Sequence, residues 1–229
     1  MATYLVTGSS RGLGLALVKE LVSRDTAEVS LVIVKREAGG VVFISLDVSN
    51  ESSISSCAET ASSVVGQKGV DGLINCAGVH SETHGERVLM SDLDYQLSVN
   101  FVGAHNMTRA FLPLLRKGAL KKVAKISSVY ASMTKAELSS FAPCPAYKIS
   151  KAALNALTVQ YAMSYKNEGY VSLAWLRTDM GGGDAHLTAV QEAQAVLKVV
   201  EKAEKDSNGC SKNIDIPGWD IYDRKDIAW

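Results

Sequence analysis

The sequence has few of the residues that define disulfide-rich or metal-binding proteins. Its 229 residues include only four cysteines, which stand far apart and form no Cys-x-x-Cys pair. Neither a disulfide framework nor a cysteine-based zinc site is expected, because both need cysteines at short or fixed spacings. The four histidines are expected in loops or at the surface, so no metal site is predicted. Unpaired cysteines are typical of a reducing compartment, which indicates a cytoplasmic protein.

The sequence also lacks a surplus of one charge and a long apolar run. Lys and Arg number 24, as do Asp and Glu, and no basic cluster is longer than that at 120–122. A nucleic-acid-binding surface needs an excess of positive charge, so no nucleic-acid partner is expected. No apolar run approaches the roughly 20 residues of a membrane-spanning helix. The chain begins almost directly with a strand-like run, so neither a membrane anchor nor a cleavable signal is predicted.

Short β-branched or apolar runs alternate along the chain with longer amphipathic stretches. Strands are predicted at residues 3–7, 29–34, 41–46, 70–75, 122–128 and 170–176. Helices are predicted at residues 14–24, 52–66, 91–117 (bent near Gly103), 145–167 and 188–205. This alternation is typical of a mostly parallel sheet covered on both faces. The predicted fold is α/β: a single Rossmann-type doubly wound domain, 1–229, with a cofactor half (about 1–125) and a catalytic and substrate half (about 126–229).

One connection does not fit this pattern. Only residues 35–40 join the second and third predicted strands, whereas a parallel crossover usually needs about a dozen residues or more. Taken alone, residues 29–46 resemble an antiparallel hairpin with a glycine turn. The alternative is a parallel crossover without a helix, which is strained because six extended residues reach only roughly 20 Å.

A glycine-rich loop suggests the first chemistry. The run VTGSSRGLG, residues 6–14, follows a predicted strand and opens a predicted helix, with glycines at 8, 12 and 14. A dinucleotide phosphate needs close approach of the backbone and the free N–H groups of a helix N-terminus. In this strand–loop–helix context, the loop predicts a dinucleotide-binding site.

The end of the second predicted strand indicates which dinucleotide binds. Sites that prefer NAD usually place an acidic residue there, which binds the 2′-hydroxyl of the ribose. This sequence has Lys35 and Arg36 at that point, and Arg11 lies within the glycine loop. Cations suit a 2′-phosphate, which favours NADP(H) as the cofactor. The alternative is that Lys35 and Arg36 are solvated turn residues.

Seven motifs, in order, resemble those of the short-chain dehydrogenase/reductase family over almost its whole length. They are TGSSRGLG (7–14), LDV (46–48), NCAG (75–78), SVN (98–100), ISSV (126–129), YKISK (147–151) and RTDMGG (177–182). The ending IYDRKDIAW resembles the Trp-terminated tail of C-factor-like and sniffer-like carbonyl reductases, including many fungal members.

The resemblance implies a set of catalytic and cofactor-binding residues. The implied catalytic residues are Asn100, Ser128, Tyr147 and Lys151. The implied cofactor contacts are Gly8, Ser10, Arg11, Gly12, Leu13, Gly14, Lys35, Arg36, Asp47, Val48, Asn75, Ala77, Gly78, Tyr147, Lys151, Thr178 and Met180. In the family pattern, Asp47 would contact the adenine, and Thr178 would hold the nicotinamide amide. Asn100 would bend its helix and hold a water that relays protons to Lys151.

The chemistry of these residue types agrees with the resemblance. A free Tyr phenol has a pKa of about 10, and a cation one helical turn away favours the phenolate and eases proton exchange near neutrality. Lys151 can supply that charge to Tyr147, and Ser128 can donate a hydrogen bond where charge develops on a substrate oxygen. Ser127 is the competing assignment. Ser128 is preferred because it directly precedes a Val, as the catalytic Ser commonly does in the family.

The sequence departs from the family pattern in length at several places. It is short between the second and third strands, at 172–180 and between residues 219 and 222. Either the chain is truly trimmed there or the sequence lacks residues. Conversely, Ser128 and Tyr147 are 19 positions apart, which is longer than usual. Residues 131–146 therefore predict an extra loop beside the active site, where loops commonly set specificity.

The predicted function is NADPH-dependent reduction of a ketone or aldehyde to an alcohol, with Tyr147 as the proton donor. Two alternatives keep the same fold: an NADP(H)-binding regulatory or signalling protein, and a non-redox cyclase or isomerase. The predicted partner is a small carbonyl or alcohol substrate. A homodimer is also expected, because helices matching 91–117 and 145–167 commonly pair across a dimer axis in the family.

Overall fold

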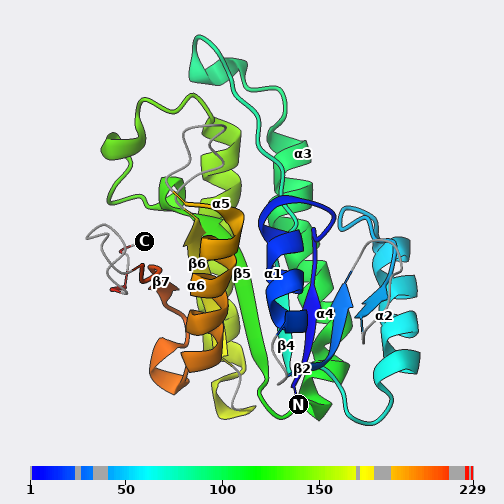
Figure 1. Ribbon diagram of the computed structural model, residues 1–229. Helices are drawn as coiled ribbons and strands as arrows, with labels where there is room; N and C mark the ends of the chain where they lie inside the picture. The colour runs from blue at the N-terminus through cyan, green and yellow to red at the C-terminus, as the bar shows by residue number, and fades with distance from the viewer. Residues whose placement is uncertain are drawn as a thin grey trace.

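The computed structural model describes most of the chain. It covers residues 2–23, 27–32, 41–168, 171–177, 187–216, 225, 226 and 228, with the backbone alone for 27–32 and 171–177. Within these residues the strands form a seven-stranded sheet in the order β3-β2-β1-β4-β5-β6-β7, and all neighbouring strands are parallel (Figure 1). The strands are β1 (Ala2–Val6), β2 (Ala27–Val32), β3 (Val41–Phe43), β4 (Gly72–Asn75), β5 (Lys122–Ser128), β6 (Val171–Arg177) and β7 (Ser211–Lys212).

The strand order confirms the predicted doubly wound α/β fold. The chain winds outward from β1 to β3, returns to β4 beside β1, and then winds the other way to β7. A ligand crevice is expected where the winding direction reverses, at the carboxyl ends of β1 and β4. Strand β7 was not predicted, because its two residues are too short to give a sequence signal.

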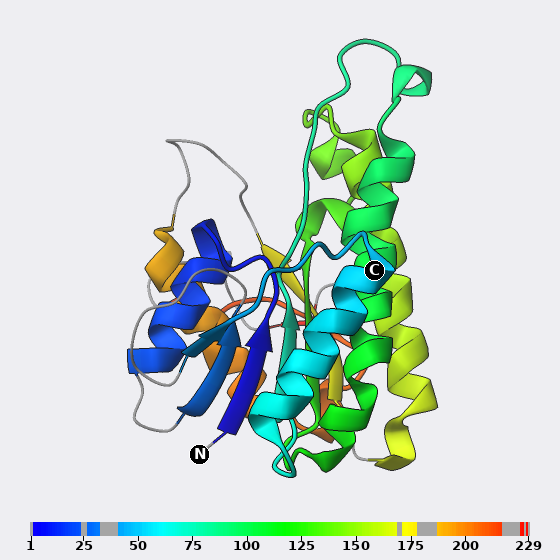
Figure 2. The ribbon, with the colours of Figure 1, turned by 90° about the vertical axis from the view of Figure 1, so that its right-hand side faces the viewer.

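Helices cover both faces of the sheet. The α-helices are α1 (Gly12–Ser23), α2 (Glu51–Val65), α3 (Leu93–Leu97), α4 (Ala104–Lys117), α5 (Pro145–Ser164) and α6 (Ala189–Lys202). Short helical turns are η1 (Arg87–Leu89), the π-helical η2 (Ser98–Gly103), η3 (Val129–Ala131), η4 (Glu137–Ser139), η5 (Lys166–Glu168) and η6 (Lys205–Ser207). Helices α1 and α6 lie on one face, and α2, α4 and α5 lie on the other (Figures 1 and 2).

The alternation of side chains along β1 divides the core into two layers. Tyr4 and Val6 pack into the cluster that includes α1 and α6, whereas Leu5 packs into the cluster that includes α2 and α4. Successive strand residues point to opposite faces, so a strand covered by helices on both sides is apolar throughout. This arrangement explains why TYLV gives a continuous apolar run rather than an alternating one.

Of the two alternatives for residues 29–46, the structure has the parallel pairing, and the antiparallel hairpin is wrong. Strands β2 and β3 pair in parallel, with Ser30 opposite Val41 and Val32 opposite Phe43. The connecting residues 33–40 lie outside the described part of the chain. The third strand ends at Phe43, not at residue 46 as predicted, so the crossover returns to a strand of only three residues. Parallel pairing brings the segment after β3, with Asp47, to the same edge of the sheet as the glycine loop.

The predicted bend near Gly103 is the π-helical turn η2, which runs between α3 and α4. Gly103 lies against the segment that follows β3, because a Cβ built on it would lie 2.8 Å from the carbonyl oxygen of Val48. A larger residue would push this turn away from the sheet edge. The turn thus fixes the distance between the start of α4 and the segment after β3 that carries Asp47 and Val48.

We expect Gly103→Ala to lower the free energy of unfolding by about 1–3 kcal/mol, measured by urea denaturation. The clash with Val48 costs more than the roughly 1 kcal/mol by which Ala exceeds Gly as a helix former. The control is Val64→Ala, on α2 at a residue that is 41% exposed, for which a change within about 0.5 kcal/mol is expected. A Gly103→Ala variant as stable as the unaltered protein would contradict the described packing.

Candidate active site

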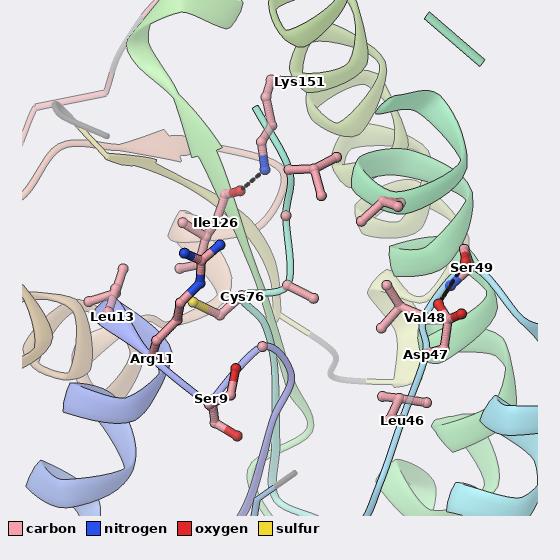
Figure 3. A pocket seen from close by; sticks show the side chains of 18 of the residues that line it. Ser9, Arg11, Leu13, Leu46, Asp47, Val48, Ser49, Cys76, Ile126 and Lys151 are labelled. Carbon is pink, nitrogen blue, oxygen red and sulfur yellow. Dashed lines mark hydrogen bonds between the residues drawn. The ribbon is translucent and has the colours of Figure 1, made fainter. Parts of the chain in front are cut away.

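A cavity of about 660 Å³ opens at the carboxyl ends of β1, β4 and β5, where the fold predicts a ligand crevice (Figure 3). Predicted cofactor residues that line it are Gly8, Ser10, Arg11, Gly12, Leu13, Gly14, Asp47, Val48, Ala77, Gly78, Tyr147 and Lys151. Other lining residues are Ser9, Leu46, Ser49, Cys76, Val79, Tyr95, Val99, Ile126 and Ser127. Figure 3 shows Arg11 and Asp47 on opposite sides of the cavity.

Five of the predicted cofactor positions are not among the described residues that line the cavity. Lys35, Arg36, Thr178 and Met180 lie outside the described residues. Asn75 lies at the end of β4, where its side chain is buried and its amide has no hydrogen-bond partner among the described residues.

The glycine loop is packed too tightly for side chains at two of its glycines. Gly8 has a φ of +69°, and a Cβ there would lie 2.6 Å from the Cα of Ala77. A Cβ on Gly14 would lie 2.3 Å from the carbonyl oxygen of Gly8. Gly12 has a φ of +55°, and beyond its own neighbours in the chain nothing lies within 4 Å of the place of its Cβ. The loop therefore presents bare backbone at the start of α1, which fits the pyrophosphate of a dinucleotide.

Thr7 fastens the glycine loop to the neighbouring strand. Its N–H donates to the carbonyl of Ile74 at 3.0 Å, and its Oγ1 accepts hydrogen bonds from the N–H groups of Cys76 and Ala77, both at 3.0 Å. This residue was not singled out from the sequence. A buried polar side chain at the end of an apolar strand run was the signal that could have identified it.

The wall opposite the glycine loop carries a fixed carboxylate. Asp47 accepts hydrogen bonds from the N–H of Ser49 at 2.9 Å and from its hydroxyl at 2.6 Å. These two bonds hold the pKa of the Asp47 carboxyl below its ordinary value. The carboxylate stays charged and is held at the edge of the cavity, as an acceptor for a polar group of a bound ligand.

Asn100 joins three segments through one buried side chain. Its Nδ2 donates to the carbonyl of Val79 at 2.9 Å, and its Oδ1 accepts from the N–H of Val79 at 2.8 Å. The same Nδ2 also lies 2.9 Å from the hydroxyl oxygen of Ser150 on α5. The amide thus ties the segment after β4 to the π-helical turn and to α5.

Tyr147 and Lys151 lie on one face of α5, as their spacing predicts. The Nζ of Lys151 is 5.6 Å from the centre of the Tyr147 ring and donates to the carbonyl of Ile126 at 2.7 Å (Figure 3). Both side chains are buried. The Tyr147 ring packs in an apolar cluster with Ala142 and Cys144, which come from the predicted extra loop and the start of α5.

The two serines at the end of β5 have different surroundings. Ser127 is buried, and its hydroxyl donates to the Oδ1 of Asn155 at 2.5 Å. Ser128 accepts a hydrogen bond from the N–H of Tyr130 at 3.2 Å and so caps η3. Ser127, and not Ser128, is among the residues that line the cavity, although its hydroxyl proton is directed to α5.

Two loops beside Tyr147 brace each other, and they rise together above the sheet in Figure 2. The N–H of Thr83 donates to the carbonyl of Pro143 at 2.6 Å, which joins the two loops. The Nζ of Lys148 on α5 donates to the carbonyl of Ser139 at 2.5 Å, which holds the second loop against the helix. The extra loop predicted from the long Ser128–Tyr147 spacing therefore does lie beside Tyr147. Its residues Ala142 and Cys144 pack with Tyr147, and the segment around Thr83 is hydrogen-bonded to this loop.

No group of three or more metal-ligating side chains occurs among the described residues. His80 and His84 stand four positions apart, but their segment is not helical, so the spacing does not place them on one face. Among the described helices, none is long and apolar enough to cross a membrane.

An α/β doubly wound sheet, a bare glycine loop and a buried Tyr–Lys pair together define a dinucleotide-binding protein of the Rossmann type. Residues 2–180 match the family model described as short chain dehydrogenase. The chain belongs to this family, which confirms the resemblance seen in the sequence.

Individual relatives agree with this assignment. The C-signal protein of Myxococcus xanthus is 34% identical over 149 residues, covering 61% of this chain and 86% of that protein. The short-chain dehydrogenase/reductase AacuF of Aspergillus aculeatus is 32% identical over 193 residues, covering 76% and 72%. Among solved structures, the NADPH-bound carbonyl reductase from chicken fatty liver superposes with a TM-score of 0.88 at 25% identity, covering 100% of this chain and 94% of that one.

Replacing Ser127 and Ser128 separately by Ala is expected to affect stability unequally. Ser127→Ala leaves the buried Asn155 Oδ1 without its donor, which costs about 1–3 kcal/mol of unfolding free energy. Ser128→Ala removes a cap of one short helical turn, and we expect a loss below about 1 kcal/mol. Thermal denaturation of both variants measures the difference. Equal losses of stability in the two variants would contradict the greater structural role of the Ser127 hydroxyl.

Proposed function

We propose that this protein is an NADPH-dependent carbonyl reductase that converts a ketone or aldehyde to an alcohol. The observation that carries the proposal is the buried Tyr147–Lys151 pair, which lines the same cavity as the bare glycine loop. The carbonyl reductase from chicken fatty liver, which covers nearly the same length, supports this reaction class. In the proposal, the whole chain, 1–229, acts as one domain, with its cofactor half before about residue 126.

The residues present fit a dinucleotide. The backbone at the start of α1 and the glycines of the loop would hold the pyrophosphate, and Asp47 and Val48 would lie beside the adenine. Lys151 would bind the ribose next to the nicotinamide, and Thr178 would hold the nicotinamide amide. When bound, NADPH supplies the hydride that reduces the carbonyl carbon.

The protein's own part in the reaction is the proton. Tyr147 donates the proton of its hydroxyl to the substrate oxygen, and the nearby Lys151 ammonium stabilises the phenolate left behind. Ser128 donates a hydrogen bond to the same substrate oxygen as negative charge develops on it. Asn100 holds the segment after β4 against α5, so that the cavity wall stays in place around the reacting groups.

Selectivity for NADPH over NADH comes from positive charge near the 2′-phosphate in this proposal. Arg11 lines the cavity at the glycine loop. Lys35 and Arg36 follow β2 in the sequence and would supply further charge at the position where an acid would select NAD. A guanidinium binds a phosphate with two parallel hydrogen bonds, which makes Arg11 a strong contributor.

A second candidate is a regulator that binds NADP(H) without turnover. The relative named C-signal favours it, because that name denotes a signal rather than a reaction. The Tyr147–Lys151 pair argues for the reductase, because cofactor binding alone requires no proton donor. A non-redox isomerase or cyclase would be recognised by product formation without NADPH oxidation.

We also propose a homodimer formed through α4, α5 and the π-helical turn between α3 and α4. Val102, Ile149 and Met163 on these elements are 40%, 42% and 60% exposed. Light scattering at micromolar concentration measures the mass, and a monomer would count against this assembly.

Tyr147→Phe is expected to reduce kcat about 100-fold or more, because loss of the hydroxyl removes the general acid. The dissociation constant for NADPH, measured by fluorescence titration, should change less than twofold. The control is Tyr161→Phe on the same helix, whose hydroxyl lies 2.6 Å from the His105 ring nitrogen, away from the cavity. This control should retain most of the activity, whereas full activity in Tyr147→Phe would refute the proposed proton donor.

Arg11→Ala is expected to weaken NADPH binding about tenfold and to leave NADH binding nearly unchanged. The reason is that one charge-assisted contact with the 2′-phosphate is worth about 1.4 kcal/mol or more. Lys19→Ala, on the following turns of α1 and outside the cavity lining, serves as the control for a general loss of positive charge. Equal weakening of both cofactors would contradict a phosphate contact by Arg11.

A further inference from the structure

His80 lies directly against the proposed proton donor. Its ring meets the ring of Tyr147 edge to face, with the two centres 4.9 Å apart and the planes at 71°. The imidazole is partly buried, in the segment that follows β4 and two residues after Gly78. The reaction as proposed above assigns it no part.

The backbone that carries His80 is held on both sides. On one side, the N–H and carbonyl of Val79 both bond to the Asn100 amide, at 2.8 and 2.9 Å. On the other side, the hydroxyl oxygen of Ser81 accepts a hydrogen bond from the Gln96 amide at 2.7 Å. These hydrogen bonds hold the residues on both sides of His80 in place. The backbone position that brings the His80 ring against Tyr147 is therefore set by Asn100 and Gln96.

Ionisable groups surround the His80 ring from its own loop and from two helices. Glu82 and His84 follow it on the loop, and His84 pairs with Glu82 at 3.6 Å. Asp92 lies at the start of α3, and its carboxylate bonds to Ser81 and to Gln96. Helix α5 contributes Tyr147 and Lys151, whose ammonium lies over the Tyr147 ring. The thiol of Cys144, next to Tyr147, has a pKa raised by burial.

Burial lowers the pKa of His80 below its ordinary value, and the carboxylates of Glu82 and Asp92 partly oppose this effect. The ring is therefore uncharged at neutral pH and gains a proton only on the acid side of pH 6.5. Protonation then places a cation against the Tyr147 ring. A nearby positive charge lowers the pKa of a phenol, which makes it a better proton donor.

We propose that His80 is a positioning residue for Tyr147, which holds the phenol in one orientation and, when protonated, adds a second positive charge beside it. This inference rests on the proposed function, in which Tyr147 gives its proton to the substrate. His80 itself transfers no proton to the substrate. Its two contributions can be separated, because a phenyl ring at position 80 keeps the ring contact and removes the charge.

The first test is the dependence of kcat on pH between 5 and 8, at saturating NADPH and with the carbonyl compound that is turned over fastest. In the unaltered enzyme, kcat should rise about threefold to tenfold as the pH falls through the His80 pKa, because a charge at about 5 Å strengthens the acid. His80→Phe should lose this rise and keep its kcat at pH 8 within about twofold. His80→Ala should lose kcat at every pH.

The matched control is His84→Phe, at the exposed histidine of the same loop. It should keep the pH profile of the unaltered enzyme. All three variants should bind NADPH with unchanged affinity. The charge role of His80 is overturned if His80→Phe retains the acid-side rise, and the positioning role is overturned if His80→Ala retains full kcat.

The second test needs no turnover. The ring protons of His80, assigned by their loss in His80→Phe, should show an NMR ring-current shift from Tyr147. The shift should persist in Tyr147→Phe and disappear in Tyr147→Leu, whose folding is checked by circular dichroism. An unshifted His80 signal in the unaltered protein overturns the contact. Absence of turnover with every carbonyl compound would instead defeat the proposed function, while the NMR comparison would still decide whether His80 holds the Tyr147 ring.

Discussion

The buried amide of Asn100 is the interaction on which the site depends most. With one side chain it binds both backbone groups of Val79 and reaches Ser150 on α5. An amide that is only 1% exposed must satisfy its hydrogen bonds within the protein. The three contacts therefore hold Val79, the π-helical turn and α5 in fixed positions relative to one another. They set the distance between the end of β4, where the cofactor cavity lies, and the helix that carries Tyr147 and Lys151. The π-helical turn provides the extra backbone needed to place the amide there.

On the cofactor side of the cavity, the shape of the glycine loop is set by close packing of backbone against backbone. Gly8 and Gly14 stand where any Cβ would overlap another segment, and Thr7 bonds the loop to the end of β4. On the catalytic side of the cavity, the main constraint on the structure is the burial of the Lys151 charge. Lys151 is 4% exposed and gives a hydrogen bond to the Ile126 carbonyl, which offsets part of the cost of removing its ammonium from water. The two sides meet at the same cavity, so binding and proton transfer share one set of walls.

The sequence was sufficient for the class of fold and for the position of the Tyr–Lys pair. Alternating apolar and amphipathic runs determine an α/β sheet, and a four-residue spacing on a helix determines a shared face. The sequence left the connection between β2 and β3 open between a hairpin and a parallel crossover, because local spacing carries no information on the pairing of β2 with β1 and of β3 with β2 in one parallel sheet. The roles of Thr7 and of His80 beside Tyr147 could not be predicted, because both depend on contacts between distant segments.

Loss of NADPH absorbance with a panel of aldehydes, ketones, diketones and quinones, run beside NADH, decides whether the protein is a carbonyl reductase. We expect turnover with at least one carbonyl compound, faster at equal concentration with NADPH than with NADH, and formation of one alcohol for each NADPH consumed. Tight binding of NADPH without turnover of any compound, or product formation without loss of NADPH, would contradict the proposed function.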